Sequence, residues 1–390
     1  MDANRFMSYS LTDERVARIL AAAIGAVEPG RLVREHLQTT ELPKHERVFL
    51  LGIGKAAEAM TQAASEFFDE FSEGLVITKH TRGLCSGQSA IIVMEGGHPI
   101  PDERSLRAGK AALDFVAQLN EDDLLICLIS GGGSALVTAP KEGNSLEDIQ
   151  AQTAKLLANG AAIHELNRMR CQMDHIKGGG LARATKAKAI GLILSDVIGN
   201  SLETIASGLT VDPSSGNRVQ NFIVGDIRTA AQAAQQRAVS EGFDSRILDL
   251  QVQGEAREAG LRMAKRLKEE RRKKHKPFCL IAGGETTVTL QGNGKGGRNQ
   301  ELALAAVDEL SGTDKILLIS LATDGDDGPT EAAGAVANGA TRQRAESLGI
   351  SAADHLARNN AYNFFRPLND LIQCGYTGTN VNDLIFLVGL

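Results

Sequence analysis

Glycine clusters flanked by hydroxyl or charged side chains are the parts of this chain that could do chemistry. The densest is Ser130-Gly131-Gly132-Gly133-Ser134, which directly follows an apolar run typical of a buried strand. Successive glycine N–H groups can turn inward and bind an anion where a helix begins. The sequence therefore predicts a phosphate-binding loop here in preference to a plain turn.

A second glycine turn, Gly52-Ile53-Gly54-Lys55, precedes a predicted helix. The GxxxxGK[ST] spacing is absent and Ala56 stands where the hydroxyl would be, so this is not a Walker site. A lysine at the start of a helix can still place a positive charge on a phosphate. From this motif alone, Lys55 is equally well interpreted as a phosphate-binding residue and as a solvated lysine at the start of a helix.

A GxGxxG pattern spans residues 292–297, with Asp314 about twenty residues further on, as in dinucleotide-binding proteins. The preceding residues, TTVTLQG, alternate between apolar and polar as an edge hairpin does. The following residues, 298–301, are more polar than a dinucleotide-binding helix needs. We therefore discount dinucleotide binding at this pattern.

Carboxylates follow three predicted strands: Asp196, Glu285, and Asp324 with Asp327. Such groups can hold Mg²⁺ or accept a proton from a substrate hydroxyl. One alone would be a helix cap or a turn residue, but three sets favour a functional role. His98 is the histidine of most interest, and the sequence has neither zinc-ligand spacing nor a GxSxG elbow.

Elements that could position these residues alternate along the chain. Continuous apolar strands separated by helices predict a mostly parallel sheet covered on both faces, with ligands at the carboxyl ends of its strands. A composition shift near residue 240 predicts two domains, 1–240 and 241–390. The expected strands are 47–54, 74–79, 90–97, 123–133, 189–197, 277–290, 315–322 and 383–390, and the helices include 102–119, 228–240, 299–310 and 338–348.

Composition excludes several classes of protein. Glycine accounts for 41 of 390 residues, without a collagen period, and the net charge of −6 argues against a general nucleic-acid binder. The basic run 265–276 is interpreted as a solvated helix end. Five scattered cysteines without a CxxC pair, no signal-peptide layout and no apolar run near about 18 residues predict a cytoplasmic protein without a membrane partner.

The ordered blocks of the whole chain resemble the glycerate 2-kinase family with a C-terminal MOFRL domain, whose bacterial members are often named hydroxypyruvate reductases. Three positions depart from the family's usual prolines, namely Ile198, Leu209 and Tyr376. The blocks are GIGKAA (52–57), GGHPIPDERS (96–105), LISGGGSAL (128–136), LNRMRCQMDHIKGGGLA (166–182), SDVIGN (195–200), IASGLT (205–210), GGETTV (283–288), GKGGRNQE (294–301), ATDGDDGPTEAAGA (322–335) and TGTNVNDL (377–384).

The resemblance implies an N-terminal Rossmann-like, doubly wound α/β domain and a smaller C-terminal α/β MOFRL domain, with the active site in the cleft between them. It implies ATP-dependent phosphorylation of D-glycerate to 2-phosphoglycerate with Mg²⁺, so the expected small-molecule partners are D-glycerate and ATP, with no nucleic acid and no membrane. We expect a homodimer. By matching motif, Lys55 and Asp196 are the expected catalytic residues. The other expected site residues are Ser130, Gly131, Gly132, Gly133, Ser134, Arg170, Lys177 and Arg298 for substrate or phosphate, and Glu285, Asp324 and Asn382 for nucleotide or metal.

The alternative function is an NAD(P)-dependent hydroxypyruvate reductase. The naming habit of the family and the GxGxxG pattern at 292–297 support it. A hydride-transfer site would need a histidine–carboxylate pair facing the substrate carbonyl, and the sequence indicates no such pair.

Overall fold

The computed structural model describes residues 1–158 and 163–390 and divides the chain into two compact units. One unit is the continuous segment Pro29–Asp226, and the other combines Met1–Glu28 with Ile227–Leu390. The chain therefore passes from one unit to the other twice. These boundaries differ from the single one expected at residue 240.

Helix α9 (Ile227–Ser240) explains the difference. Its alanine face is buried and packs against α1 (Glu14–Ala26), so both helices belong to the second unit although one lies near each end of the expected first domain. The N-terminus is held there too, since the buried carboxylate of Asp370 accepts hydrogen bonds from Ser10 N at 2.7 Å and Arg344 Nη1 at 2.7 Å. As a result the two units are similar in size rather than large and small.

The 29–226 unit is built on a six-stranded sheet in which all neighbours are parallel. Its order, β3-β2-β1-β4-β5-β6, is that of a doubly wound Rossmann sheet, so the predicted fold class is confirmed. The strand order reverses between β1 and β4, which makes their carboxyl ends the expected ligand site. The strands are β1 (Arg47–Ile53), β2 (Glu73–Thr78), β3 (Ile91–Glu95), β4 (Asp123–Ile129), β5 (Lys188–Leu194) and β6 (Val219–Gly225).

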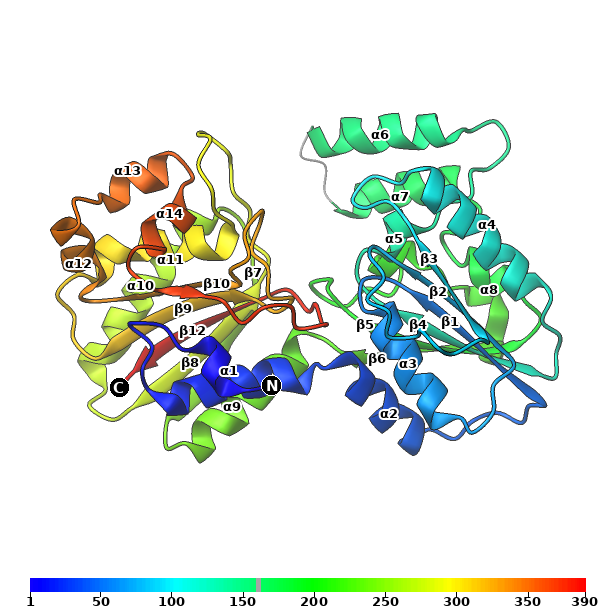
Figure 1. Cartoon of the computed structure of the whole chain (residues 1–390), viewed down its shortest axis with the longest axis horizontal. Helices are drawn as coiled ribbons and strands as arrows, with labels where there is room; N and C mark the ends of the chain where they lie inside the picture. Colours follow the sequence, from blue (N-terminus) through cyan, green and yellow to red (C-terminus); the bar gives the residue numbers. More distant parts are fainter. Residues whose placement is uncertain (159–162) are drawn as a thin grey trace. The chain divides into compact units, whose positions relative to one another are not determined.

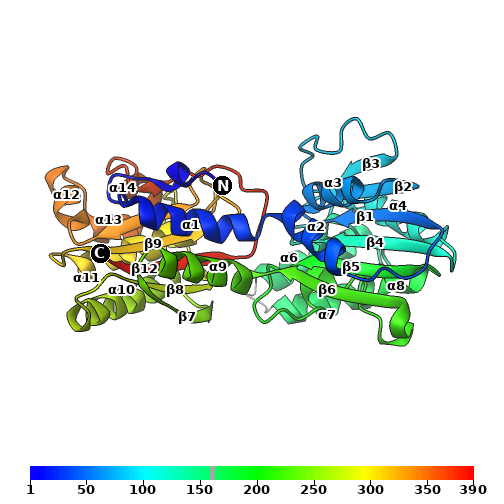
Figure 2. The ribbon, with the colours of Figure 1, turned by 90° about the horizontal axis from the view of Figure 1, so that it is seen from below.

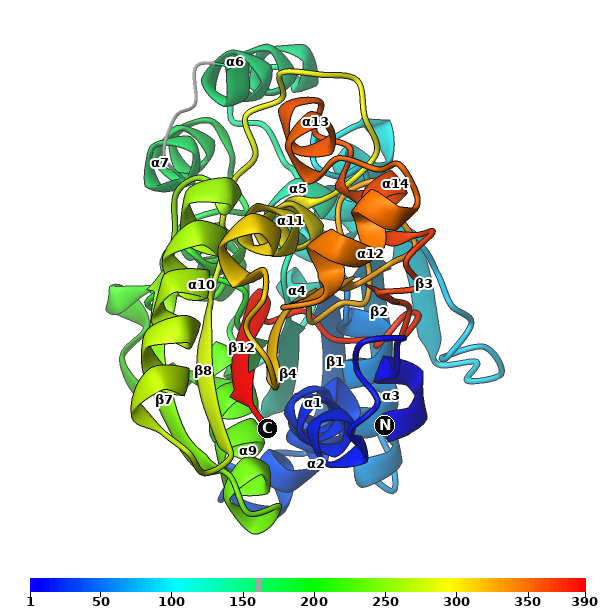
Figure 3. The same cartoon turned by 90° about the vertical axis from the view of Figure 1, so that its left-hand side faces the viewer.

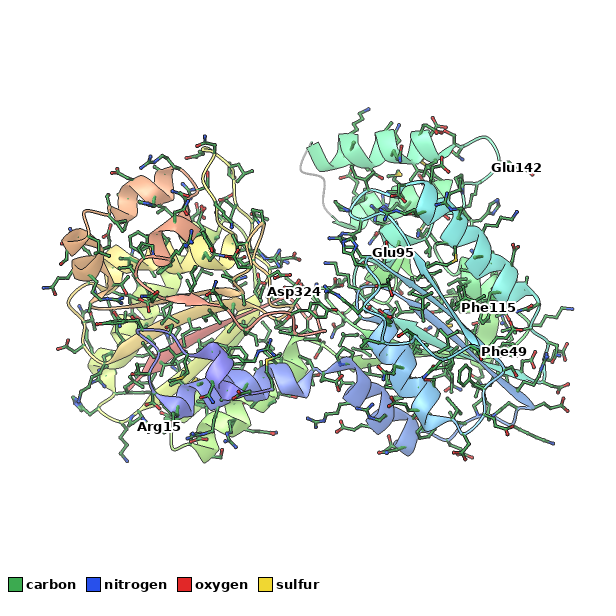
Figure 4. The ribbon with its side chains drawn as sticks, in the orientation of Figure 1. Arg15, Phe49, Glu95, Phe115, Glu142 and Asp324 are labelled. Atoms are coloured by element: carbon green, nitrogen blue, oxygen red, sulfur yellow. The ribbon has the colours of Figure 1, made fainter. Side chains whose placement is uncertain are left out.

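Helices cover both faces of this sheet (Figures 1 and 2). One face carries α2 (Pro29–Thr39) and α3 (Ala57–Phe67), which pack together. An edge-to-face pair between Phe49 of β1 and Phe115 of α4 (Glu103–Ala117), with ring centroids 6.1 Å apart, belongs to the packing on the other face (Figure 4). The remaining helices are α4 (Glu103–Ala117), α5 (Gly133–Leu136), α6 (Leu146–Ala158), α7 (Ile163–Met173) and α8 (Gly180–Ala184).

The second unit has a mixed six-stranded sheet of order β11-β10-β9-β12-β8-β7, in which only β7 and β8 are parallel. Helices α1 and α9 lie on one side of it and α10 to α14 on the other (Figure 3). The strands are β7 (Asp244–Val252), β8 (Phe278–Gly284), β9 (Ile316–Ala322), β10 (Gly334–Asn338), β11 (Leu371–Ile372) and β12 (Asp383–Gly389), and the helices are α10 (Ala256–Lys273), α11 (Arg298–Leu310), α12 (Thr341–Ser347), α13 (Ala352–Ala357) and α14 (Ala361–Phe365).

Two expected elements of this unit are shorter than predicted. The strand expected over 277–290 ends at Gly284, and the alternating residues after it form a single bridge, Glu255 with Thr287, instead of a hairpin. The helix expected over 338–348 begins at Thr341, because Asn338 is the last residue of β10 and Ala340 is the N-cap of the helix. The basic run does end a helix, α10. No helix in the described part of the chain is long and apolar enough to cross a membrane.

Candidate active site

The carboxyl ends of β1 and β4 are fastened to each other. Lys55 N donates to Gly131 O at 2.9 Å, and Ala56 N donates to the buried Ser130 Oγ at 2.9 Å. A Cβ on Gly54, whose φ is +136°, would lie 2.2 Å from Ser130 Oγ, so only glycine permits this approach. Lys55 is thereby held beside the glycine loop at the point where the strand order reverses.

The glycine loop leaves backbone donors unused. Gly132 has a φ of +85°, the left-handed region that favours glycine, and precedes the short helix α5. The N–H groups of Gly131 and Gly132 make no hydrogen bond to any residue that the structure describes. Such donors are the groups that a phosphate-binding loop offers.

The side chains of the two expected catalytic residues, Lys55 and Asp196, pack against this loop. A Cβ on Gly131 would stand 1.9 Å from Asp196 Oδ2, so the carboxylate after β5 rests against that glycine. A Cβ on Gly132 would stand 3.3 Å from Lys55 Cγ. Neighbouring glycines of one loop therefore face Asp196 and Lys55.

A hydrogen-bonded chain of side chains continues from the loop. Arg170 Nη1 donates to Ser134 Oγ at 2.9 Å, the Ser134 and Ser207 hydroxyls are 2.5 Å apart, and Ser207 Oγ donates to Asn167 Oδ1 at 2.8 Å. Burial lowers the pKa of Arg170 to about 10, so this guanidinium is charged at neutral pH. Ser207 and Asn167 were not predicted as site residues.

Ser207 has unusual backbone geometry. Ala206 and Ser207 have φ values of +50° and +58°, which non-glycine residues seldom adopt and which cost about 1–3 kcal/mol each. Ala206 Cβ would lie 3.1 Å from a Cβ on Gly133. The strained turn thus packs on the glycine loop, a contact between residues about seventy positions apart that no local pattern indicates.

Lys177 supports this region in a different way. Its Nζ donates to Val137 O at 2.5 Å, just after α5, and the side chain is buried. Burial lowers its pKa to about 8. The ammonium is therefore already engaged with the segment that follows the glycine loop.

In the second unit, Arg298 joins Glu285 and a residue that was not predicted, Asp383. Its guanidinium bonds Asp383 through Nε at 2.6 Å and Nη2 at 3.1 Å, and Glu285 through Nη1 at 2.6 Å. Burial opposes the positive charge of Arg298, but the adjacent Asp383 outweighs it and raises the arginine's pKa. Arg298 is the first residue of α11, Glu285 directly follows β8, and Asp383 is the first residue of β12.

Asp324 and Asn382 flank the same region of the second sheet. Thr323 donates from N and Oγ1 to Asn382 O, at 3.1 and 2.6 Å. Asp324, labelled in Figure 4, comes next in the chain, and its carbonyl accepts from Thr377 N at 3.3 Å. Both residues offer oxygen atoms, the ligands that Mg²⁺ prefers.

The GxGxxG segment has a structural use. Gly292 N and Gly294 N donate to Asn359 Oδ1 and Arg358 O, both at 3.0 Å, and a Cβ on Gly292 would lie 2.6 Å from Arg358 Cα. The glycines therefore allow close packing of two loops. This accounts for the pattern without a dinucleotide.

The start of α11 is also occupied. Asn299 N and Gln300 N donate to the carboxylate of Asp327 at 3.1 and 2.9 Å. Asp327 is buried, and burial raises its pKa to about 7. A pyrophosphate bound at this helix would need the donors that Asp327 already uses.

A doubly wound sheet with a glycine loop beside a lysine and a carboxylate at its switch point is an arrangement in which α/β proteins bind anionic ligands. The family described as "Domain of unknown function (DUF4147)" matches residues 15–239, and the MOFRL family matches residues 278–383. These matches fall on either side of residue 240.

Relatives cover nearly the whole chain. The D-glycerate 2-kinase of Thermotoga maritima is 38% identical over 94% of this chain and 96% of its own. The glycerate 2-kinase of Pyrococcus horikoshii is 35% identical over 95% of this chain and 96% of its own. The crystal structure of the Thermotoga maritima glycerate kinase superposes with a TM-score of 0.87, covering 96% of this chain and 98% of that one. The chain therefore belongs to the glycerate 2-kinase family with a C-terminal MOFRL domain, and the predicted resemblance is confirmed.

Proposed function

We propose that this protein is a D-glycerate 2-kinase, which transfers the γ-phosphoryl group of ATP to the 2-hydroxyl of D-glycerate. The single observation that carries the proposal is the placement of Lys55 and Asp196 against adjacent glycines of one loop at the switch point of the sheet. The similarity to curated glycerate 2-kinases supports the choice of substrate.

Phosphoryl transfer needs positioning and charge neutralisation more than covalent chemistry. In our proposal the N–H groups of Gly131 and Gly132 and the ammonium of Lys55 bind phosphoryl oxygens. Arg170, held by Ser134, orients the substrate carboxylate. Asp196 accepts the proton of the 2-hydroxyl as that oxygen attacks phosphorus.

Mg²⁺ is part of the proposal. Among the described residues no three His, Cys, Asp or Glu side chains gather as a ready-made metal site, but Mg²⁺ is commonly held by one or two protein oxygens together with substrate phosphates. The oxygens of Asp324 and Asn382 fit that limited role. When bound, the ion neutralises phosphate charge.

The test uses the whole protein with ATP, Mg²⁺ and D-glycerate, and separately with hydroxypyruvate and NADH. We expect ADP release in the first assay and no NADH oxidation in the second. A ¹³C and ³¹P NMR spectrum of the product should place the phosphate on carbon 2. NADH oxidation without ADP release would contradict the proposal and favour the reductase alternative.

The oligomeric state and cellular location stay predictions. Light scattering during size-exclusion chromatography tests the expected homodimer. A fluorescent fusion of the whole chain in its host cell tests the expected cytoplasmic location.

A further inference from the structure

The segment after β3 brings His98 to the glycine loop. A Cβ on Gly96 would lie 2.2 Å from Leu136 O, and one on Gly97 would lie 2.6 Å from Asp102 Cγ, so this backbone packs directly on α5 and on the start of α4. The imidazole of His98 then reaches Gly132. Its Cδ2 and Nε2 lie 3.2 and 3.4 Å from the position of a Cβ on that glycine.

Three positive side chains act electrostatically on this imidazole, namely Lys55, Lys79 and Arg170. Lys55 Cγ lies 3.3 Å from the same point above Gly132. Burial, and then the charges of Lys55, Lys79 and Arg170, lower the pKa of His98 to about 4, so the ring is neutral at pH 7. Neither ring nitrogen forms a hydrogen bond with the described part of the chain. A neutral donor is thus left among three cations.

We propose that His98 contacts the substrate directly, with its Nε2–H donating a hydrogen bond to an oxygen of the anion that Lys55, Lys79 and Arg170 attract. The inference rests on the proposed function, in which that oxygen belongs to a phosphoryl group of ATP or to the carboxylate of D-glycerate. Both are oxyanions. A neutral imidazole contributes a directional hydrogen bond without adding a fourth positive charge to the site.

Two substitutions distinguish a hydrogen bond made by Nε2 of His98 from one made by Nδ1. In H98Q the side-chain amide reaches about as far as Nε2, whereas in H98N it reaches only about as far as Nδ1. We expect H98Q to stay within about threefold of the natural kcat/KM, and H98N and H98A to lose about 10- to 100-fold, as for a hydrogen bond to a charged group. A larger KM for D-glycerate identifies the carboxylate as the partner, and a larger KM for ATP identifies a phosphoryl group.

The matched control is H45Q. His45 precedes β1 at the opposite end of that strand from Lys55, and its ring bonds Pro43 O at 2.7 Å. We expect H45Q to leave both KM values unchanged. If H98Q, H98N and H98A have the same thermal unfolding midpoint as the natural protein, a folding defect is excluded as the cause of any loss of activity. An H98N enzyme as active as the natural one, or an H98Q enzyme as impaired as H98A, would overturn the proposal.

A binding measurement keeps the test separate from catalysis. Histidine ring signals of ¹⁵N-labelled protein, assigned with H98Q, are followed during addition of inorganic phosphate, ATP or D-glycerate. We expect the His98 Nε2 signal to move with at least one of them. If the protein fails to phosphorylate D-glycerate yet this signal moves, the proposed function fails and the role of His98 stands. A signal that no ligand moves contradicts the role of His98 whatever the activity.

Discussion

Lys55 carries the positive charge that β1 delivers to the glycine loop, through the bond from its own N–H to Gly131. In K55A the backbone bond remains while the ammonium is lost. We therefore expect kcat for glycerate phosphorylation to fall roughly 100- to 1,000-fold, the usual effect of removing one preorganised charge-stabilising donor. The measurement is ADP release at saturating substrate.

K44A is the control for this variant. Lys44 precedes the amino end of β1, so K44A removes the same charge at the opposite end of that strand from Lys55. Full turnover by K55A, or an equal loss in K44A, would show that Lys55 does not act on the phosphoryl group.

The lowered pKa of His98 also predicts how the free energy of unfolding depends on pH. Its native pKa of about 4 lies below the value of about 6.5 expected in the unfolded chain. Between these values the unfolded state binds more protons, so this group lowers the free energy of unfolding as pH falls from about 6.5 toward 4. Urea titrations at pH 7, 6 and 5 should show a smaller decline for H98Q than for the natural protein. An identical slope would mean that the pKa of His98 is the same in the native and the unfolded states.

At the scale of elements, the glycine loop depends on having no side chain at Gly131. A methyl group there would meet Asp196 Oδ2 at 1.9 Å, so in G131A either the carboxylate or the loop must move. We expect kcat to fall about 100-fold, because misplacement by about 1 Å is enough for such a loss. G25A is the control, since a Cβ on Gly25 in α1 would lie 3.7 Å from Met1 N, an ordinary van der Waals distance. Unchanged kinetics in G131A would refute the tight placement of Asp196.

The cap of α11 is a second element-scale feature. D327A removes the acceptor of two buried N–H groups, and we expect the free energy of unfolding to drop by about 2 kcal/mol. D314A, which changes an aspartate after the same helix, should alter it by less than about 0.5 kcal/mol. Chemical unfolding curves provide the comparison. Equal stability of the two variants would mean that Asp327 is not an effective cap.

Sequence patterns located the strand ends and the charged residues on them, because continuous apolar runs and glycine turns are local signals. They could not show that Ser207 adopts a left-handed conformation or that it bonds Ser134, since both facts depend on contacts distant in sequence. The same holds for Asp383, whose pairing with Arg298 joins the starts of α11 and β12. The sequence did not predict strand β7, because its more buried and more exposed residues alternate irregularly.

At the scale of the whole molecule, the discontinuous second unit predicts which fragments fold. Residues 29–226 form a continuous unit with its own parallel sheet, so this fragment should unfold cooperatively when isolated. Residues 241–390 lack both α1 and α9, which cover one side of the second sheet (Figure 3). We expect that fragment to be unstable.

Circular dichroism during urea unfolding tests both fragments. A fusion of residues 1–28 to 227–390 is the matched comparison, and it should recover a cooperative transition. A stable 241–390 fragment would show that α1 and α9 are dispensable for this unit.

The position of α1 also sets the order of events during synthesis. Its buried face includes Val16, Ile19, Leu20 and Ile24, and its partner helix α9 begins at Ile227. At about 5–20 residues per second a ribosome needs on the order of ten seconds or more to reach that partner. During this interval the nascent chain presents an unpaired apolar helix ahead of a unit that can already fold, which makes α1 a binding segment for a chaperone until α9 is synthesised.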